Sequence, residues 1–268
     1  MCYQCLGEDL LPRRRFLKLA AVAAAAAATG SLFDPVQAAA APRSTFPTVA
    51  APTIITREQW GADETIRDGR GLIGWSPFRK IVIHHTASPN SAKDPKAMVR
   101  IGYELHTVRR GYSDIGYHFL IGPKGEIFEG RRARTYRRGE LHTGEDGAGN
   151  AVIGGHTKGR NAGSCGIALL GTFTSRAPSD AAIASLIKLI SWEAQRHKID
   201  PLGNDTYVDL EGKTLTFPNI VAHRGVGNTL CPGTRMAASI PWLRNEVAKQ
   251  VGRFPTRKAD MRRLAWVF

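Results

Sequence analysis

Side chains that zinc prefers as ligands stand at the ends of two apolar stretches of this sequence. His84 and its neighbour His85 end one stretch, His223 follows the other, and Cys231 comes eight residues later. Zinc binds imidazole nitrogen and thiolate sulfur, and a catalytic site uses three protein ligands and keeps the fourth position for water. The residue types predict a zinc site of two histidines and one cysteine. Spacing alone leaves the choice between His84 and His85 open.

The segment from His223 to Cys231 has the composition of a loop that returns to its starting point. Gly225, Gly227 and the pair Pro232-Gly233 permit tight turns. A single histidine at a strand end is more often structural, and a single cysteine is more often a small buried hydrophobe. The prediction of a metal site therefore depends on the joint pattern.

Apolar runs and turn residues predict the strands that position these side chains. Short runs of apolar residues bounded by glycine or proline are typical of buried strands, and Pro123-Lys124-Gly125 is a hairpin signal. The expected strands cover residues 79–84, 116–122, 126–130, 165–170 and 218–222.

Helix signals alternate with these strands along the chain. Asp94 and Ser179 are good N-caps, and Ile183, Leu186, Ile187 and Ile190 recur at helical spacing after Ser179. The expected helices cover residues 95–108, 180–197 and 241–251. Strands alternating with helices predict one α/β domain, and we expect a central mixed β-sheet flanked by about three helices, with the zinc site at the strand ends.

Length and charge restrict the class of protein further. The chain has 268 residues, 43% of them hydrophobic, and a formal net charge of +14. Such a surface suits an anionic partner such as nucleic acid, anionic lipid or a phosphate-rich cell wall. Zinc-finger and RNA-binding motifs are absent from the sequence, so we expect no nucleic-acid partner. The sequence does not specify an oligomeric state, and we expect a monomer.

The first 41 residues resemble an export signal. Arg13 and Arg14 are followed by Phe16, Leu17 and Lys18, as in twin-arginine signals, although Pro12 replaces the usual Ser or Thr. The apolar stretch that follows, residues 19–28, is too short to cross a bilayer. A general secretory signal is the alternative. We expect export by the twin-arginine route to the periplasm, the cell wall or the medium.

The expected segments are a signal peptide (1–41), a linker rich in Pro, Ala and Thr (42–53), the folded domain (54–251) and a basic tail (252–268). Cys2 and Cys5 would leave with the signal peptide. Cys165 lies in an apolar run typical of a buried strand, which argues against a disulfide with Cys231. The tail would allow electrostatic contact with an anionic wall or membrane surface.

From about residue 54 to residue 241 the chain resembles the peptidoglycan recognition proteins and the related type-2 N-acetylmuramoyl-L-alanine amidases. Six segments match in family order. They are Ile55–Ala62 (ITREQWGA), Val82–Ala87 (VIHHTA), Asp114–Gly122 (DIGYHFLIG), Gly125–Arg131 (GEIFEGR), Gly155-His156 with Asn161, Ser164 and Gly166–Leu169 (GIAL), and Ala222-His223-Arg224 through Cys231-Pro232-Gly233.

The resemblance implies roles for particular residues. The family places Zn²⁺ on the first histidine of the His-His pair, on the histidine of Ala-His-Arg and on the cysteine before Pro-Gly, here His84, His223 and Cys231. Family members that do not cut typically lack this cysteine. The tyrosine of Asp-Ile-Gly-Tyr, here Tyr117, lies beside the metal in the family. Thr229 stands where phage enzymes have lysine, which puts a lysine-dependent mechanism in doubt.

Four further residues are predicted to contact substrate or to support the site. His156 matches a family position near the substrate groove, and Asn161 belongs to the same matching segment. His85 and His118 have an alternative role as hydrogen-bond partners or structural residues. The implied reaction is zinc-dependent hydrolysis of the amide between N-acetylmuramic acid and L-alanine in peptidoglycan, with Tyr117 and Thr229 stabilising the oxyanion. The alternatives are a module that binds muropeptides without cutting them and a zinc amidase acting on another amide.

Overall fold

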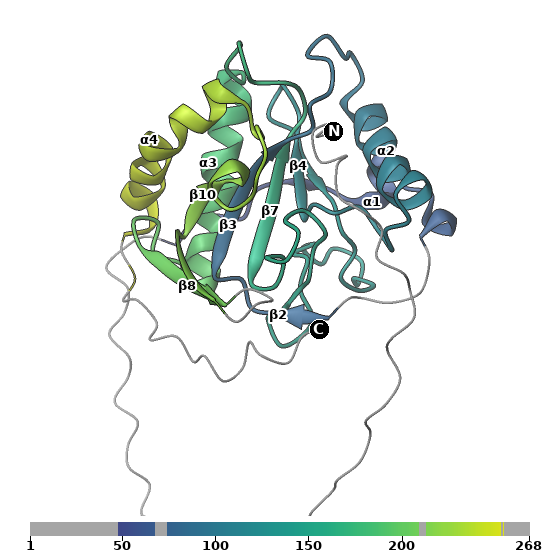
Figure 1. Cartoon of the computed structure of the whole chain (residues 1–268). Coiled ribbons are helices and arrows are strands. Elements are labelled where there is room, and N and C mark those ends of the chain that lie inside the picture. The colour runs from purple at the N-terminus through teal and green to yellow at the C-terminus, as the bar shows by residue number, and fades with distance from the viewer. Residues whose placement is uncertain (1–47, 68–73, 209–212, 253, 255–268) are drawn as a thin grey trace, which may run out of the picture.

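The computed structural model describes residues 48–67, 74–208, 213–252 and 254 (Figure 1). The predicted signal peptide lies outside the described residues, as does the predicted tail except for Gly252 and Phe254. The last part of the predicted linker contacts the folded domain. Val49 packs against the core, and its backbone N–H donates to the Gln195 Oε1 at 2.7 Å.

A six-stranded mixed sheet forms the centre of the structure, in the order β1-β5-β4-β7-β3-β10. β4 and β5 are antiparallel, while β3 runs parallel to both β7 and β10. The strands of this sheet are β1 (Ile54–Ile55), β3 (Lys80–His85), β4 (Phe119–Ile121), β5 (Ile127–Glu129), β7 (Ser164–Leu169) and β10 (Ile220–Ala222). Two small antiparallel pairs join β2 (Trp75–Ser76) to β6 (Ala151–Val152) and β8 (Asn204–Val208) to β9 (Thr214–Pro218).

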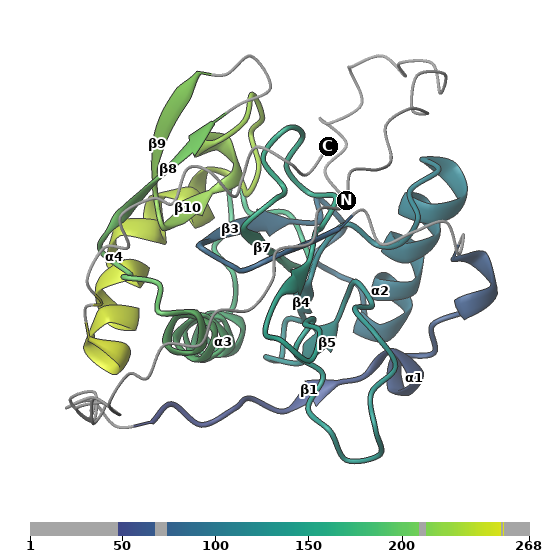
Figure 2. The same ribbon diagram turned by 90° about the horizontal axis from the view of Figure 1, so that it is seen from below.

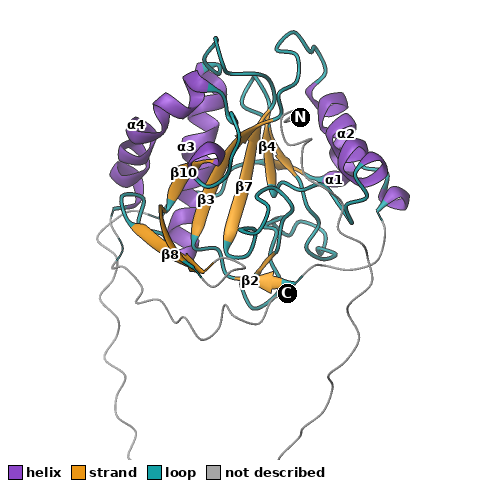
Figure 3. Cartoon of the chain, in the orientation of Figure 1, coloured by secondary structure: helices purple, strands orange, loops and turns teal. Residues whose placement is uncertain are grey.

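Helices cover both faces of the sheet, as the view from below shows (Figure 2). α3 (Asp180–His197) and α4 (Thr234–Val251) lie on one side, and α1 (Arg57–Trp60) and α2 (Pro95–Glu104) lie on the other (Figure 3). α2 continues into a π-helical turn, Leu105–Arg109, and 3₁₀ turns cover Glu64–Ile66 and His223–Gly225. This arrangement confirms the predicted single α/β domain with a mixed sheet. In the described residues the α-helices are the three longer helices α2, α3 and α4 and the short α1.

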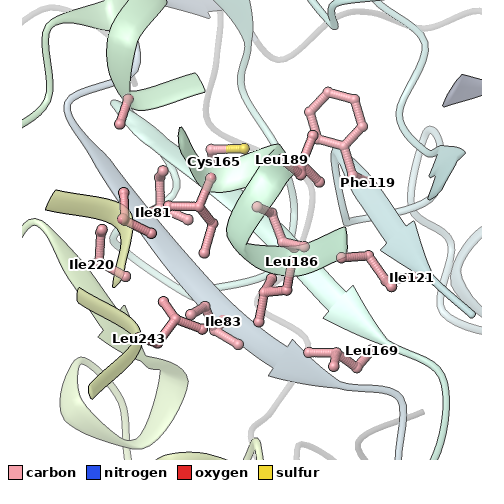
Figure 4. Packing of buried hydrophobic residues seen from close by; sticks show 14 of the residues in the cluster. Ile81, Ile83, Phe119, Ile121, Cys165, Leu169, Leu186, Leu189, Ile220 and Leu243 are labelled. Atoms are coloured by element: carbon pink, nitrogen blue, oxygen red, sulfur yellow. The ribbon is translucent and has the colours of Figure 1, made fainter. Parts of the chain in front are cut away.

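The face under α3 and α4 carries the larger hydrophobic core. Alternate residues of β3, Ile81 and Ile83, pack there with Leu186 and Leu189 of α3 (Figure 4). Because side chains alternate across a strand, Val82 and His84 point to the opposite face. Cys165 is fully buried within this core as a free thiol. The expectation that it forms no disulfide with Cys231 is therefore confirmed.

Both predicted N-caps are present in the structure. The Asp94 carboxylate accepts from the Ala97 N–H at 3.1 Å, and the Ser179 hydroxyl accepts from the Ala182 N–H at 3.2 Å. Each bond satisfies one of the backbone donors that a helix leaves unpaired at its start. The predicted hairpin around residues 123–125 is also present, with its strands shortened to β4 and β5.

One predicted boundary was wrong, and one hairpin was not predicted. The last helix begins at Thr234 rather than at Pro241, which lies inside it. Proline costs a helix one hydrogen bond, but the apolar face from Met236 to Val251 stays buried on both sides of it, so packing overrides the local preference. The β8–β9 hairpin was not predicted. In β9, exposed Thr214 and Thr216 alternate with half-buried Leu215 and Phe217, which is the pattern of a strand with one face in solvent.

No helix in the described ranges is long and apolar enough to cross a membrane.

Candidate metal centre

The parallel pairing of β3 with β10 brings two histidines together. In this register Ile83 lies opposite Ala222, so the next residues along, His84 and His223, are neighbours at the ends of the two strands. Their ring centroids are 4.4 Å apart. Both are buried.

The loop after β10 returns Cys231 to the same point. The Arg224 N–H donates to the Cys231 carbonyl at 2.8 Å and closes the loop. The Cys231 Sγ then lies 3.7 Å from the His84 Nδ1 and accepts from the His85 backbone N–H at 3.3 Å. A backbone donor aimed at sulfur stabilises the thiolate, which is the form that binds metals.

The donor set fits a zinc ion. One ligand atom each from His84, His223 and Cys231 lies within 4.8 Å of the other two. Tetrahedral zinc with bonds of about 2.1 Å to nitrogen and 2.3 Å to sulfur would separate the two atoms by about 3.6 Å. The observed 3.7 Å between the His84 Nδ1 and the Cys231 Sγ matches that separation.

The His-His pair divides between the two faces of the sheet. His84 faces His223, Tyr117 and Cys231, whereas the His85 ring lies over Phe173 at 6.3 Å between centroids. The His85 Nδ1 accepts from the Phe173 N–H at 3.4 Å. Tertiary structure therefore places His84, and not His85, with the other two donors.

Tyr117 and Thr229 border the donor set. The Tyr117 ring lies 5.2 Å from the His84 ring between centroids and is 6% exposed. The Thr229 Oγ1 accepts from the Cys231 N–H at 3.2 Å, which holds the hydroxyl two residues from the sulfur ligand. Both residues therefore lie next to the group of donors, and their catalytic roles stay predictions.

His156 is buried and contacts His84, whereas Asn161 is half-buried and contacts the backbone of His156. The His156 Nδ1 is 3.0 Å from the His84 Nε2. The Asn161 Oδ1 accepts from the backbone N–H groups of His156 and Thr157, both at 2.8 Å, and so holds this turn. Burial, followed by the nearby His118, holds the pKa of His156 well below its usual value, so its imidazole is neutral.

His118 has both ring nitrogens bonded to backbone. The Nδ1 accepts from the Gly166 N–H at 2.9 Å, so the Nε2 carries the hydrogen and donates to the Val152 carbonyl at 2.7 Å. Burial lowers the pKa of His118 to about 4. With both nitrogens bonded and its surface 1% exposed, His118 has the geometry of a structural residue.

His106 also lies near the site, although the sequence gave no reason to single it out. Its ring is 5.4 Å from the Tyr117 ring, and its Nδ1 accepts from the Gly116 N–H at 3.0 Å. Burial, followed by the charge of Arg110, lowers the pKa of His106 to about 3. Nothing in the local pattern distinguishes it from a helical surface residue, because its contacts come from the Gly116 segment, ten residues away.

A second cluster of ionisable residues lies away from the metal centre. Glu193, Arg196 and His197 of α3 meet Glu145 from the loop before β6. The His197 Nε2 lies 2.5 Å from Glu145 and 3.2 Å from Glu193, and Arg196 pairs with the same two carboxylates. Two cations alternate with two anions in this ring. These ion pairs link the loop that carries Glu145 to α3. His142 lies outside the cluster and pairs with Glu129 at 2.7 Å.

A pocket opens beyond the end of β3. It is lined by the segment that follows the His-His pair, by α2 and by Thr172; the lining residues are Ala87, Ser88, Pro89, Asn90, Met98, Ile101 and Thr172. Most of these are small or apolar, and Ile101 is 45% exposed. The pocket therefore offers a mainly apolar surface close in sequence to His84.

Comparison with known proteins agrees with this geometry. Residues 74–234 match the family described as N-acetylmuramoyl-L-alanine amidase (Amidase_2), which is well over half of the chain. Peptidoglycan-recognition protein 1 of Holotrichia diomphalia is 32% identical over 130 residues, 48% of this chain and 56% of that protein. The chain thus spans less than two thirds of this relative.

Two solved structures share the fold. Drosophila peptidoglycan recognition protein SD is 28% identical, with a TM-score of 0.52 over 70% of this chain and 92% of that one. The second structure is the ectodomain complex of peptidoglycan recognition proteins LCa and LCx with bound tracheal cytotoxin, and one chain of it is 25% identical to this chain. Its TM-score is 0.51, over 70% of this chain and 95% of that one.

Fold, site geometry and sequence agree on the class of protein. The chain belongs to the N-acetylmuramoyl-L-alanine amidase family, and it is similar in sequence and structure to peptidoglycan recognition proteins. The family predicted from the six sequence motifs is thereby confirmed.

Proposed function

We propose that this chain is a zinc-dependent N-acetylmuramoyl-L-alanine amidase, which hydrolyses the amide between the lactyl group of N-acetylmuramic acid and L-alanine in bacterial peptidoglycan. The observation that carries the proposal is the buried group of His84, His223 and Cys231, whose ligand atoms lie within 4.8 Å of one another. The family match supports the reaction, and the relatives' names and the bound tracheal cytotoxin support a peptidoglycan fragment as the ligand.

The protein's residues have separate tasks in this reaction. His84, His223 and Cys231 would hold the ion, which when bound supplies Lewis-acid polarisation of the scissile carbonyl and activation of water. Tyr117 lies against the His84 ring, where its hydroxyl can donate to the oxyanion that develops on the carbonyl oxygen. Thr229, held by the Cys231 N–H, supports that position.

A module that binds peptidoglycan without cutting it is the second candidate, because the similar proteins are named as recognition proteins. Cys231 favours the enzyme, since the resemblance implies that family members which do not cut typically lack this cysteine. A binding module would need the fold and the pocket but not the thiolate ligand.

Two measurements on the purified protein distinguish these candidates. Zinc content by mass spectrometry should be one ion per chain, and digested sacculi should release stem peptides that begin with L-alanine. One bound zinc without such products would support the binding module. Products cut at another amide would identify a different zinc amidase. Cys231→Ser is the control that should lose the product while leaving muropeptide binding measurable.

A further inference from the structure

The two nitrogens of His84 have different partners. Its Nδ1 lies 3.7 Å from the Cys231 Sγ, and its Nε2 lies 3.0 Å from the Nδ1 of His156. A neutral imidazole has one N–H and one lone pair, and a metal-ligating nitrogen must present the lone pair. If Nδ1 is the ligand, the hydrogen must be on Nε2, and this N–H then donates to His156.

The same logic determines the proton on His156. Its Nδ1 accepts from His84, so its hydrogen is on Nε2, which lies 3.3 Å from the Ser164 carbonyl oxygen. A carbonyl can only accept, which fixes the end of this chain of hydrogen bonds. The Thr157 hydroxyl oxygen also lies 2.8 Å from the His156 Nδ1 and is a second possible donor to the single lone pair of that nitrogen.

The surroundings of His156 are shaped for an imidazole ring. A Cβ at Gly166 of β7 would lie 2.5 Å from the His156 Cγ and Cδ2, and one at Gly154 would lie 2.7 Å from Cδ2. Both glycines therefore leave space that the ring fills. His118 packs edge-on against the ring at 5.6 Å between centroids, and Asn161 holds the His156 backbone.

We propose that His156 is a positioning residue that holds His84 in the tautomer and orientation needed to bind the metal, through a chain of hydrogen bonds that ends at the Ser164 carbonyl. This inference rests on the zinc site of the proposed amidase and deepens it. It gives His156 a role other than the expected contact with substrate, because its ring is buried and contacts His84.

A pair of variants with matched shape tests this role. Leucine and asparagine branch alike at Cγ, but in His156→Asn the amide oxygen can take the place of Nδ1 and accept from His84, whereas His156→Leu offers no acceptor. Zinc affinity is measured by competition with a chelator, without substrate. We expect His156→Leu to bind zinc about 10- to 100-fold more weakly, the usual effect of losing such an outer partner.

His156→Asn should recover most of that loss, because it restores the acceptor. A loss common to both variants would show that the imidazole merely fills space, and wild-type affinity in His156→Leu would overturn the proposal. Circular dichroism and thermal unfolding of the metal-free variants show whether a loss of affinity reflects a loss of folding.

A measurement on the wild-type protein covers the case in which His156→Leu does not fold. Long-range ¹H–¹⁵N NMR spectra of the zinc-loaded protein report which imidazole nitrogen carries hydrogen. We expect a hydrogen on Nε2 of both His84 and His156. A His84 ring protonated on Nδ1 would contradict the proposed chain.

Failure of this inference is distinguishable from failure of the proposed function. Zinc affinity that depends on His156, in a protein that releases no stem peptides, would remove the amidase and leave the positioning role. Release of stem peptides by a protein whose zinc affinity does not depend on His156 would support the amidase and remove the positioning role.

Discussion

His84 and Cys231 are 147 positions apart in the chain, yet the His84 Nδ1 lies 3.7 Å from the Cys231 Sγ. Two features produce this proximity. The parallel pairing of β3 and β10 places the start of the returning loop beside His84, and the bond from the Arg224 N–H to the Cys231 carbonyl closes that loop. The proposed chemistry depends on this relationship, and the first predictions test it.

Cys231→Ser should abolish muropeptide cleavage and weaken zinc binding, because a neutral hydroxyl replaces a thiolate ligand. We expect the loss of zinc affinity to exceed the roughly 10- to 100-fold typical of an outer-shell change. Cys165→Ala is the matched control: it removes another buried thiol, costs about 1–2 kcal/mol of stability, and should keep zinc and turnover. Near wild-type turnover in Cys231→Ser would contradict the zinc mechanism.

Tyr117→Phe should lower kcat by about 10²–10³, the effect of removing one oxyanion donor. The ring and its packing against His84 remain, so zinc content should not change. Tyr103→Phe removes a hydroxyl from the same hydrophobic cluster and should leave kcat unaltered. An unchanged kcat in Tyr117→Phe would mean that Tyr117 acts only as a core aromatic residue.

Removal of zinc should lower the melting temperature. The three proposed ligands come from β3, from the turn after β10 and from the returning loop, so an ion that binds only the folded state would stabilise their arrangement. Free zinc at 100 times its dissociation constant adds about 2.7 kcal/mol. Calorimetry with and without chelator measures the difference. Cys231→Ser should respond much less to the chelator, and an equal response would place the stabilising zinc elsewhere.

Stability of the metal-free protein should fall between about pH 6.5 and pH 9. Burial by itself lowers the pKa of His197, but the Glu145 and Glu193 carboxylates outweigh it and raise the pKa to about 9. A raised histidine pKa stabilises the fold fully below the unfolded value of 6.5, and the contribution is lost as pH rises through the folded value. The contribution is on the order of 3 kcal/mol at most.

Urea unfolding across this pH range, in excess chelator, measures the slope. His197→Gln should flatten it, because the titrating partner of Glu145 is gone. If the variant and the wild type lose stability in parallel, the slope comes from other groups.

Export should depend on the arginine pair at the N-terminus. Changing Arg13 and Arg14 to Lys should leave unprocessed precursor in the cytoplasm, since the twin-arginine route requires this pair. Arg15→Lys is the matched control and should be exported. Normal export of the double variant would indicate a general secretory signal. Fractionation with detection of the full-length and shortened chains gives the result.

Local sequence was sufficient for much of the fold. The apolar run of β3 and the N-caps Asp94 and Ser179 predict their elements because strand burial and capping depend on neighbouring residues. It was insufficient where distant packing overrides local preference. Pro241 lies inside α4 because the buried face continues across it. The β8–β9 hairpin was overlooked, although Thr214–Phe217 alternates between exposed and half-buried residues as a strand does.

The sequence by itself determined the candidate donors, their order in family motifs and the apolar strands that carry them. Tertiary structure decided which member of the His-His pair faces the other donors, because neighbouring side chains on a strand point to opposite faces. It also decided that His156, 72 positions from His84, contacts the ring of that histidine. Such contacts depend on the register of parallel strands and on the path of the loops that join them. The spacing of residues along the chain does not specify either of these.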